Sequence, residues 1–502
     1  MKFPQSRYMH VMPLSLALGG LATALFACDK SKESVQVVST AASVSAPETK
    51  RPTLPDADIA KAIQRHFQDE RLLRPAHVQV AVAQGIASLS GSVGSLLVKD
   101  RALAVTESIR GVRSVIDAIT VTPVARTDDQ LKADVISALR HDTATSPHAI
   151  GVAATDGTVT LSGKADSWEK RRLFEDVAER VPGVKALVND VAVHYSAARS
   201  DAEILADVRH RIGNDVWLDG DALTVTVAGH AAHLSGVVGS VAERLRARSD
   251  AFVAGVEAVD DAGVIVDWSA REDQRRIVDF PVRSDAEIAQ AVRDALGLDP
   301  RLSILMPQVA VQNGTVTLTG AVDSASARRA AEGDARDTWG VWGVRDRVLV
   351  QQSSKPTDAD IEREATRVRK DDLLLPDQQA VHVSSAKGKV TLAGTVGSGV
   401  DRLDAVMDVA SLPGVTEIDD GLVVKPPPPE IRAAIEDRLF WDPTLEPDRV
   451  SVAVAPDGVV TLTGTLDSWG EIKAATDDAV WGGAARVINL IKLKNHPEVV
   501  AP

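Results

Sequence analysis

The chain has 502 residues, 70 Asp and Glu against 56 Lys and Arg, a formal net charge of −14 and one cysteine. This acidic balance argues against a nucleic-acid binder, which needs a basic surface, and it weakens any general attraction to anionic lipid. A single thiol excludes an intrachain disulfide, so packing must stabilise the fold.

The N-terminal segment has the layout of an export signal. Lys2 and Arg7 precede a mostly apolar stretch over residues 11–26, which is shorter than the roughly 20 residues that a membrane-spanning helix needs. The sequence Leu-Phe-Ala-Cys ending at Cys28 resembles a bacterial lipobox. We therefore predict a signal peptide over residues 1–27 and a lipid anchor on Cys28. The alternative is a plain secretory signal followed by a chance cysteine.

Residues 28–55 are rich in Ser, Thr, Pro and charged side chains and have no sustained hydrophobic period. This composition is typical of a flexible tether. By random-coil scaling, the tether would place the first folded unit on the order of 30 Å from the anchor.

The remaining chain is built from repeats. A Leu-x-Gly triplet recurs about every 70 to 84 residues, at Gly91, Gly163, Gly236, Gly320, Gly394 and Gly464. A second pair follows each triplet after about twenty residues, at Gly111-Val112, Gly183-Val184, Gly255-Val256, Gly343-Val344, Gly414-Val415 and the looser Gly483-Ala484. Six copies of one supersecondary unit are therefore predicted.

Within a unit the hydrophobic period changes in a fixed order. Ile59, Ile63 and Phe67 have helical spacing, whereas apolar residues alternate around the pair Asp156-Gly157 in the second copy. Asn313-Gly314 and Asp457-Gly458 occupy the same place in copies four and six, which predicts hairpins with tight turns. A second helical stretch and a last strand follow. Each unit is predicted to be a two-layer αββαβ fold of the α+β class.

A serine stands four residues after every Leu-x-Gly glycine, at Ser95, Ser167, Ser240, Ser324, Ser398 and Ser468. Each precedes a helical stretch, where its hydroxyl is suited to cap the helix N-terminus. No histidine or carboxylate recurs with these serines, so we predict no catalytic residues and no enzyme. His230 and His233 lack Cys, Asp or Glu partners at ligand spacing, and we predict no metal and no cofactor.

The combination of αββαβ units of about 70 residues, "V-T-L-S/T-G", a capped helix and "G-V" resembles the BON domain family. The resemblance covers residues 56–123, 128–195, 200–267, 284–351, 357–425 and 428–495, with a linker over residues 268–283. It implies three-stranded sheets with two helices on one face, a periplasmic setting, osmotic induction in some members, and a role in binding phospholipid or supporting the envelope. It does not imply an enzyme.

Short linkers between small units predict an extended or curved array, in which each unit leans on its neighbour. The four prolines at residues 426–429 should form a stiff spacer that holds the last unit at a distance. In copy four, "TWGVWGV" should lengthen the gap before the last strand.

Apolar residues between the first helix and the first strand could plug the core or form exposed tips. The candidates for membrane or partner contact are Trp217, Ile304, Leu305, Leu374, Leu375, Phe440 and Trp441. Basic residues on the second helices, such as Lys170, Arg171, Arg172, Arg244, Arg246, Arg328 and Arg329, could meet phosphate headgroups but fit pairing with nearby acids better.

Two functions follow from this sequence. The favoured one is a lipid-anchored, non-enzymatic protein at the periplasmic face of the inner or outer membrane, binding phospholipid surface or envelope components through several weak copies. The alternative is a periplasmic chaperone-like or scaffolding protein that binds other proteins.

Overall fold

The computed structural model describes residues 54–500 apart from 71–72, 74–75, 143, 146–148, 196–197, 219–221, 270–282, 303–304, 352–355, 372–380, 398, 411, 425–430 and 495. The predicted signal peptide, Cys28, nearly all of the tether and the proline run at 426–429 lie outside the described residues. Within the described part of the chain, no helix is long and apolar enough to cross a bilayer.

Six units follow one another, each with two helices. The first helices are α1 (Asp56–Asp69), α3 (Asp128–His141), α5 (Asp201–Asn214), α8 (Asp285–Leu298), α10 (Asp358–Asp371) and α12 (Ile431–Trp441). The second helices are α2 (Leu96–Glu107), α4 (Trp168–Glu179), α6 (Val241–Asp250), α9 (Ala325–Arg336), α11 (Gly399–Ala410) and α13 (Trp469–Trp481). Short 3-10 helices η2 (Pro300–Leu302) and η4 (Pro447–Arg449) precede the first strands of units 4 and 6.

Each unit has three strands in chain order. Units 1 to 3 contain β1 (His77–Ala83), β2 (Ile86–Val93), β3 (Ser114–Val121), β4 (Gly151–Thr155), β5 (Thr158–Ala165), β6 (Ala186–Val193), β7 (Leu223–Ala228), β8 (Ala231–Val238) and β9 (Ala258–Val266). Units 4 to 6 contain β10 (Gln308–Gln312), β11 (Thr315–Val322), β12 (Gly343–Val350), β13 (Val381–Ala386), β14 (Lys389–Val396), β15 (Glu417–Val424), β16 (Val450–Val454), β17 (Val459–Leu466) and β18 (Arg486–Leu493). A further strand, β19 (His496–Val500), follows unit 6.

The second strand of each unit is central. It pairs antiparallel with the first strand and parallel with the third, as Val159 does with Ala154 and Leu187. The parallel connection runs through the second helix, which places both helices on one face. The prediction of six αββαβ units is thereby confirmed. In unit 6, β19 adds antiparallel to the free edge of β18.

The hairpin turns hold the predicted left-handed residues. Asp156 and Gly157 have φ of 52° and 80°, and Asn313 and Gly314 behave alike. In the hairpin turn of unit 6, Gly458 has positive φ and Asp457 does not, because the loop between Val454 and Val459 is longer than a two-residue turn.

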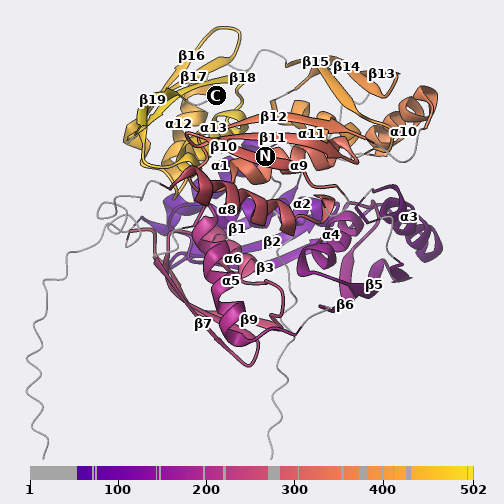
Figure 1. Cartoon of the computed structure of the whole chain (residues 1–502), viewed down its shortest axis with the longest axis horizontal. Coiled ribbons are helices and arrows are strands. Elements are labelled where there is room, and N and C mark those ends of the chain that lie inside the picture. The colour runs from indigo at the N-terminus through magenta and orange to yellow at the C-terminus, as the bar shows by residue number, and fades with distance from the viewer. Residues whose placement is uncertain are drawn as a thin grey trace, which may run out of the picture.

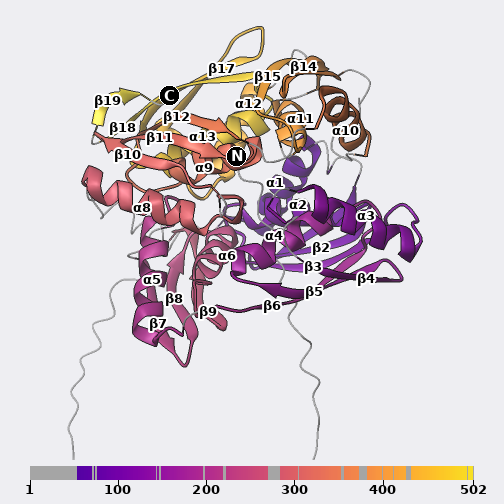
Figure 2. The same ribbon diagram turned by 45° about the vertical axis from the view of Figure 1, so that its right-hand side comes forward.

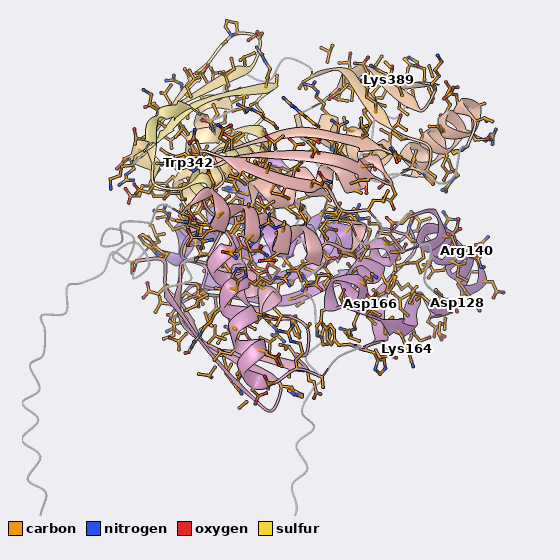
Figure 3. All side chains as sticks on the ribbon, viewed as in Figure 1. Asp128, Arg140, Lys164, Asp166, Trp342 and Lys389 are labelled. Carbon is orange, nitrogen blue, oxygen red and sulfur yellow. The ribbon has the colours of Figure 1, made fainter. Side chains whose placement is uncertain are left out.

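An aspartate in the first turn of the first helix binds the hairpin turn of its own unit. Asp128, at the beginning of α3 (Figure 3), accepts N–H groups from Asp156 and Gly157 at 3.0 and 3.1 Å. Asp56, Asp201, Asp285 and Asp358 make the same paired contacts in units 1, 3, 4 and 5. These backbone bonds lower the pKa of the Asp201 and Asp358 carboxyls.

The Leu-x-Gly glycines lie inside the central strand, two residues before its end. Gly464 has φ of 150°, and a Cβ there would lie 2.0 Å from the carbonyl oxygen of Arg449, the residue just before β16. Glycine is required because the two backbones approach too closely for a side chain.

The second glycine of copy four is Gly340 and not Gly343, so the prediction of a lengthened gap was wrong. Gly340 has φ of 87°, and Val341 after it is buried, as at Gly111-Val112. Gly343 instead begins β12. The turn before the last strand requires positive φ, and Gly340 restores the usual spacing from Gly320.

The six units do not form an extended array. Figure 2 shows units 1 to 3 (indigo to magenta) below units 4 to 6 (red to yellow), with second helices between outward-facing sheets. The first and last units touch, since the Arg110 N–H donates to the Trp441 carbonyl at 2.7 Å. Units 3 and 4 are joined where the Trp339 N–H donates to Asn214 and the Val216 N–H to Asp337. The prediction of an extended array was wrong because each second helix turns the side away from its own sheet toward other units and packs on them (Figure 1).

Candidate functional site

A cavity of about 410 Å³ lies where the second helices converge. Units 1, 2, 3 and 6 supply most of its lining from α1, α2, α4, α6, α12 and α13. Asp337, just after α9, and Leu403 on α11 bring in units 4 and 5. The cavity is therefore a property of the closed assembly and of no single unit.

The cavity lining is charged and aromatic. It contains eight Arg or Lys and eight Asp or Glu, so its formal charges are balanced. Four of the eight tryptophans of the chain line it, namely Trp168, Trp217, Trp441 and Trp481. Balanced charges beside aromatic rings suit a polar ligand better than a purely apolar one.

Units 1 and 6 meet at a charge cluster. Arg101 donates from Nε and Nη2 to the two oxygens of Glu70, both at 2.5 Å. The Arg101 guanidinium also lies 3.9 Å from the ring centroid of Trp481. Arg438 extends from α12 into the same cluster, with Nη2 3.8 Å from a Glu70 oxygen. Glu70 is thus shared between two arginines of different units.

Units 2 and 3 meet through a second cluster. Arg211 lies 2.5 Å from Glu169 and 3.3 Å from Asp250. Arg172 donates to the Ser249 hydroxyl at 2.5 Å, and Trp168 Nε1 donates to the Val256 carbonyl at 2.9 Å. These contacts satisfy polar groups that the assembly removes from water.

Burial shifts several titrations at the cavity. Desolvation raises the pKa of the Asp250 carboxyl to about 7, and nearby Asp215 adds to the rise. Desolvation also raises the pKa of Asp478 well above its ordinary value, with Asp442 contributing. The pKa of His66 falls to about 3, chiefly by burial and then by the Arg438 charge. His66 is therefore neutral at physiological pH.

Basic residues on the side of the second helices nearest their own sheet are paired, as the sequence favoured. Arg244 lies 2.9 Å from Asp261, and Arg328 lies 2.6 Å from Asp346, in each case on the last strand of the same unit. Arg171 donates to the Asn189 carbonyl at 2.6 Å. Arg246 pairs with Asp215 at the cavity.

The predicted contact residues have different fates. Trp441 is 4% exposed and packs in the joint core of units 1 and 3, so it is not an exposed tip. Trp217 is half-buried against the core of unit 6, with Lys473 Nζ 5.0 Å from its ring centroid. Phe440 and Leu305 are 43% and 38% exposed. Ile304, Leu374, Leu375 and the lipidation candidate Cys28 lie outside the described residues.

Five of the recurring serines cap their helices. The side chains of Ser95, Ser167, Ser240, Ser324 and Ser468 each accept the N–H of the residue three positions later, which confirms the capping prediction for them. Ser398 lies outside the described residues. His233 is 3.2 Å from Asp260 and His230 is 3.6 Å from Glu257. Among the described residues, no group of three potential metal ligands is present.

The sequence did not reveal the cavity. Arg110 illustrates why, since its Nη2 donates to the carbonyls of Asp442 and Leu445 at 2.8 and 2.6 Å, more than 300 residues away. One available signal was Trp481 on α13, at a position where the other five units have no aromatic residue.

Comparison with known proteins agrees with the observed units. The BON domain model matches residues 55–123, 127–195, 200–266, 284–352, 357–426 and 429–495. Osmotically-inducible protein Y of Escherichia coli (strain K12) is 29% identical over 147 residues, which are 27% of this chain and 71% of that protein.

Two solved structures of CdsD, a structural protein of the type III secretion system of Chlamydia trachomatis, are 16% identical in sequence. They cover 42% and 45% of this chain and 100% and 99% of their own chains, with a TM-score of 0.12 for both, and we base no argument on this likeness. The six matched segments, each folded as αββαβ, show that the chain belongs to the BON domain family.

Proposed function

We propose that this chain is a lipid-anchored, non-enzymatic envelope protein that works at the periplasmic face of a membrane under osmotic stress. Its BON units would bind phospholipid surface or other envelope components and support the envelope. The family and the name of the Escherichia coli relative support this proposal. So does the N-terminal lipobox, whose Cys28 would carry the anchor.

One repeated surface feature carries the proposal. On the outer face of each sheet, the last strand exposes an aliphatic side chain: Ile116, Val188, Ile265, Leu349, Val423 and Leu490, between 39% and 65% exposed. The sheets of units 1 to 3 and of units 4 to 6 face away from each other (Figure 2). One outer surface can therefore contact a membrane while the other contacts a second envelope component, each through three weak sites.

The surface is tested by vesicle co-sedimentation of the full chain carrying Cys28→Ser, which removes the anchor from the measurement. Serine replaces Ile116, Val188 and Ile265 in one variant and Leu349, Val423 and Leu490 in another. One of the two triple variants should bind phospholipid vesicles at least threefold more weakly. Val124→Ser removes a 72% exposed aliphatic side chain outside the sheets and serves as the control. No vesicle binding by the parent chain, or full binding by both triple variants, contradicts the proposed membrane contact.

The anchor is tested separately. Cys28→Ser should move the protein from the membrane fraction to the soluble fraction and remove its lipid from the mass spectrum. A variant that stays in the membrane fraction after salt and carbonate washing contradicts lipidation at Cys28.

The alternative function, a chaperone-like or scaffolding protein, is favoured by β19. This segment adds to the edge of β18 in extended form, with Lys492 opposite Val500 and Leu493 opposite His496. The equivalent strands β3, β6, β9, β12 and β15 are edge strands in their own sheets, and such edges can accept an extended peptide from another protein. Saturable binding of an unfolded polypeptide by a chain that ignores vesicles would favour this alternative.

A further inference from the structure

Arg438 is a buried arginine, and one edge of its guanidinium group makes no hydrogen bond to a described residue. Its side chain is 5% exposed and lines the central cavity. Neither Nε nor Nη2 has a hydrogen-bond partner among the described residues, and the nearest carboxylate oxygen, from Glu70, is 3.8 Å from Nη2. In Arg101, by contrast, the same two nitrogens each donate to Glu70 at 2.5 Å. These two N–H groups point in one direction and match the two oxygens of a carboxylate or phosphate group.

A group of opposite charge lies close by on the other helix of unit 6. Asp478, on α13, also lines the cavity, and its Oδ2 is buried without a hydrogen-bond partner in the described part of the chain. Arg438 and Asp478 lie on α12 and α13, the two helices of unit 6, which pack against each other. A buried donor pair and a buried carboxylate oxygen that stay unbonded destabilise the folded state, because they lose their hydrogen bonds to water without replacement.

The surroundings restrict what could satisfy both groups. Arg438 has two nitrogens and Asp478 one oxygen without a hydrogen-bond partner in the described part of the chain, so a ligand that carries only one charged group would leave one of the two side chains unbonded. Trp441 and Trp481 line the same cavity, and aromatic rings attract apolar and ammonium groups. A volume of about 410 Å³ is within the range of small-molecule sites.

We propose that the central cavity binds a small zwitterion, whose carboxylate or phosphate group is held by Arg438 Nε and Nη2 and whose ammonium group is held by Asp478. The carbon skeleton lies against Trp481 and Trp441. Such a ligand is neutral overall and supplies both missing partners at once. It would also bind unit 6 more firmly to unit 1, because the cavity exists only when these units are closed on each other.

The test is calorimetric titration of the full chain, solubilised in a nonionic detergent. The zwitterionic probes are glycine and glycerophosphoethanolamine, whose phosphodiester carries a single negative charge, and the single-charge probes are acetate and methylammonium. At least one zwitterion should bind ten times more tightly than either single-charge probe. Binding of glycine identifies a free solute as the ligand class, whereas binding of glycerophosphoethanolamine alone identifies a headgroup-like phosphate diester.

The variants separate the two charges of the ligand. Arg438→Gln and Asp478→Asn should each weaken zwitterion binding at least tenfold, whereas Arg363→Gln, on a 73% exposed side chain of α10, should leave it unchanged. Asp478→Asn keeps the side-chain shape and carries the test if Arg438→Gln does not fold. The proposal is overturned if neither zwitterion binds at millimolar concentration, if acetate binds equally well, or if Asp478→Asn binds normally. None of these outcomes depends on vesicle binding or lipidation.

Discussion

The two sides of the second helices follow different rules. Four residues after the cap position, five units have Lys or Arg, and each bonds to the last strand of its own unit: Lys99, Arg171, Arg244, Arg328 and Arg402. One residue later the side chains are Asp100, Arg172, Leu245, Arg329, Leu403 and Lys473, which differ in size and charge. Of these, Arg172, Leu245, Leu403 and Lys473 line the cavity.

This difference separates the unit from the assembly. The side that faces the sheet repeats because every unit makes the same internal contacts. The side that faces other units does not repeat because each unit meets different neighbours. Residues that recur in every unit therefore indicate how a unit folds, and residues that differ between units indicate how the units pack together.

The largest expected effect concerns a residue that recurs in every unit, the Leu-x-Gly glycine. Gly464→Ala should destabilise unit 6 by about 2–4 kcal/mol, because its Cβ would lie 2.0 Å from a carbonyl oxygen at a positive φ. Gly320→Ala, whose nearest neighbour would be 3.8 Å away, should cost about 1 kcal/mol from the φ alone. Chemical denaturation of both variants measures the difference. Equal losses would remove the close backbone approach as the reason for this glycine.

The next effect concerns a contact between units, the one that Arg110 of unit 1 makes with unit 6. Arg110→Met should cost about 2 kcal/mol, since the buried carbonyls of Asp442 and Leu445 lose their donor. Circular dichroism should stay the same while small-angle scattering shows a larger radius, because the units survive and the seam opens. Arg402→Met breaks a contact within unit 5 and should leave the radius unchanged. An unchanged radius in the Arg110 variant would contradict its role in closing the assembly.

The stability of the fold should also depend on pH through Asp250, a carboxyl at the cavity. The folded pKa of Asp250 is about 7, above the ordinary value of 3.8, so the folded state binds the proton more tightly than the unfolded state. The stabilisation from this proton is full below about pH 3.8 and is lost as the pH rises through about 7. The contribution of Asp250 to the free energy of unfolding should therefore be on the order of 1–2 kcal/mol larger at pH 5.5 than at pH 8.

Asp250→Asn should reduce this pH dependence, which urea denaturation at the two pH values can measure. Asp201→Asn affects an exposed carboxyl with a lowered pKa and should not reduce it. The same slope in Asp250→Asn as in the parent chain would show that other groups cause the dependence.

The smallest effect returns to the repeated part. Ser167→Ala removes the hydroxyl that accepts the Lys170 N–H at 3.1 Å and should cost about 1 kcal/mol. Ser162→Ala, on an exposed strand position, should change stability by less than about 0.5 kcal/mol. Thermal unfolding of the two variants tests the cap, and identical melting temperatures would refute its importance.

Much of the fold was predictable because local signals determine it. The helical spacing of Ile59, Ile63 and Phe67 and the alternation around Asp156-Gly157 depend only on residues close in the chain. The mistake at Gly343 shows the limit of such patterns. Gly340-Val341 and Gly343-Val344 are the same dipeptide, and only the backbone conformation of the turn distinguishes them.

The candidate site was not predictable on the same grounds. Trp441 was one of several apolar residues between a first helix and a first strand, and nothing nearby in the sequence indicated that unit 1 would cover it. In the same way, no residue near Trp217 in the sequence indicated that it would pack against the core of unit 6.

The sequence by itself determined the number of units, their αββαβ order, the capping serines and the acidic balance, because each of these depends on short-range periodicity or on composition. The tertiary structure alone decided that the units close into one body, that Arg110 of unit 1 meets unit 6, and that Arg438 and Asp478 share a cavity. The Arg110 contacts join residues more than 300 positions apart, and the cavity brings together side chains from all six units. Burial between units turns these charges into a site, and burial is a property of the assembled chain.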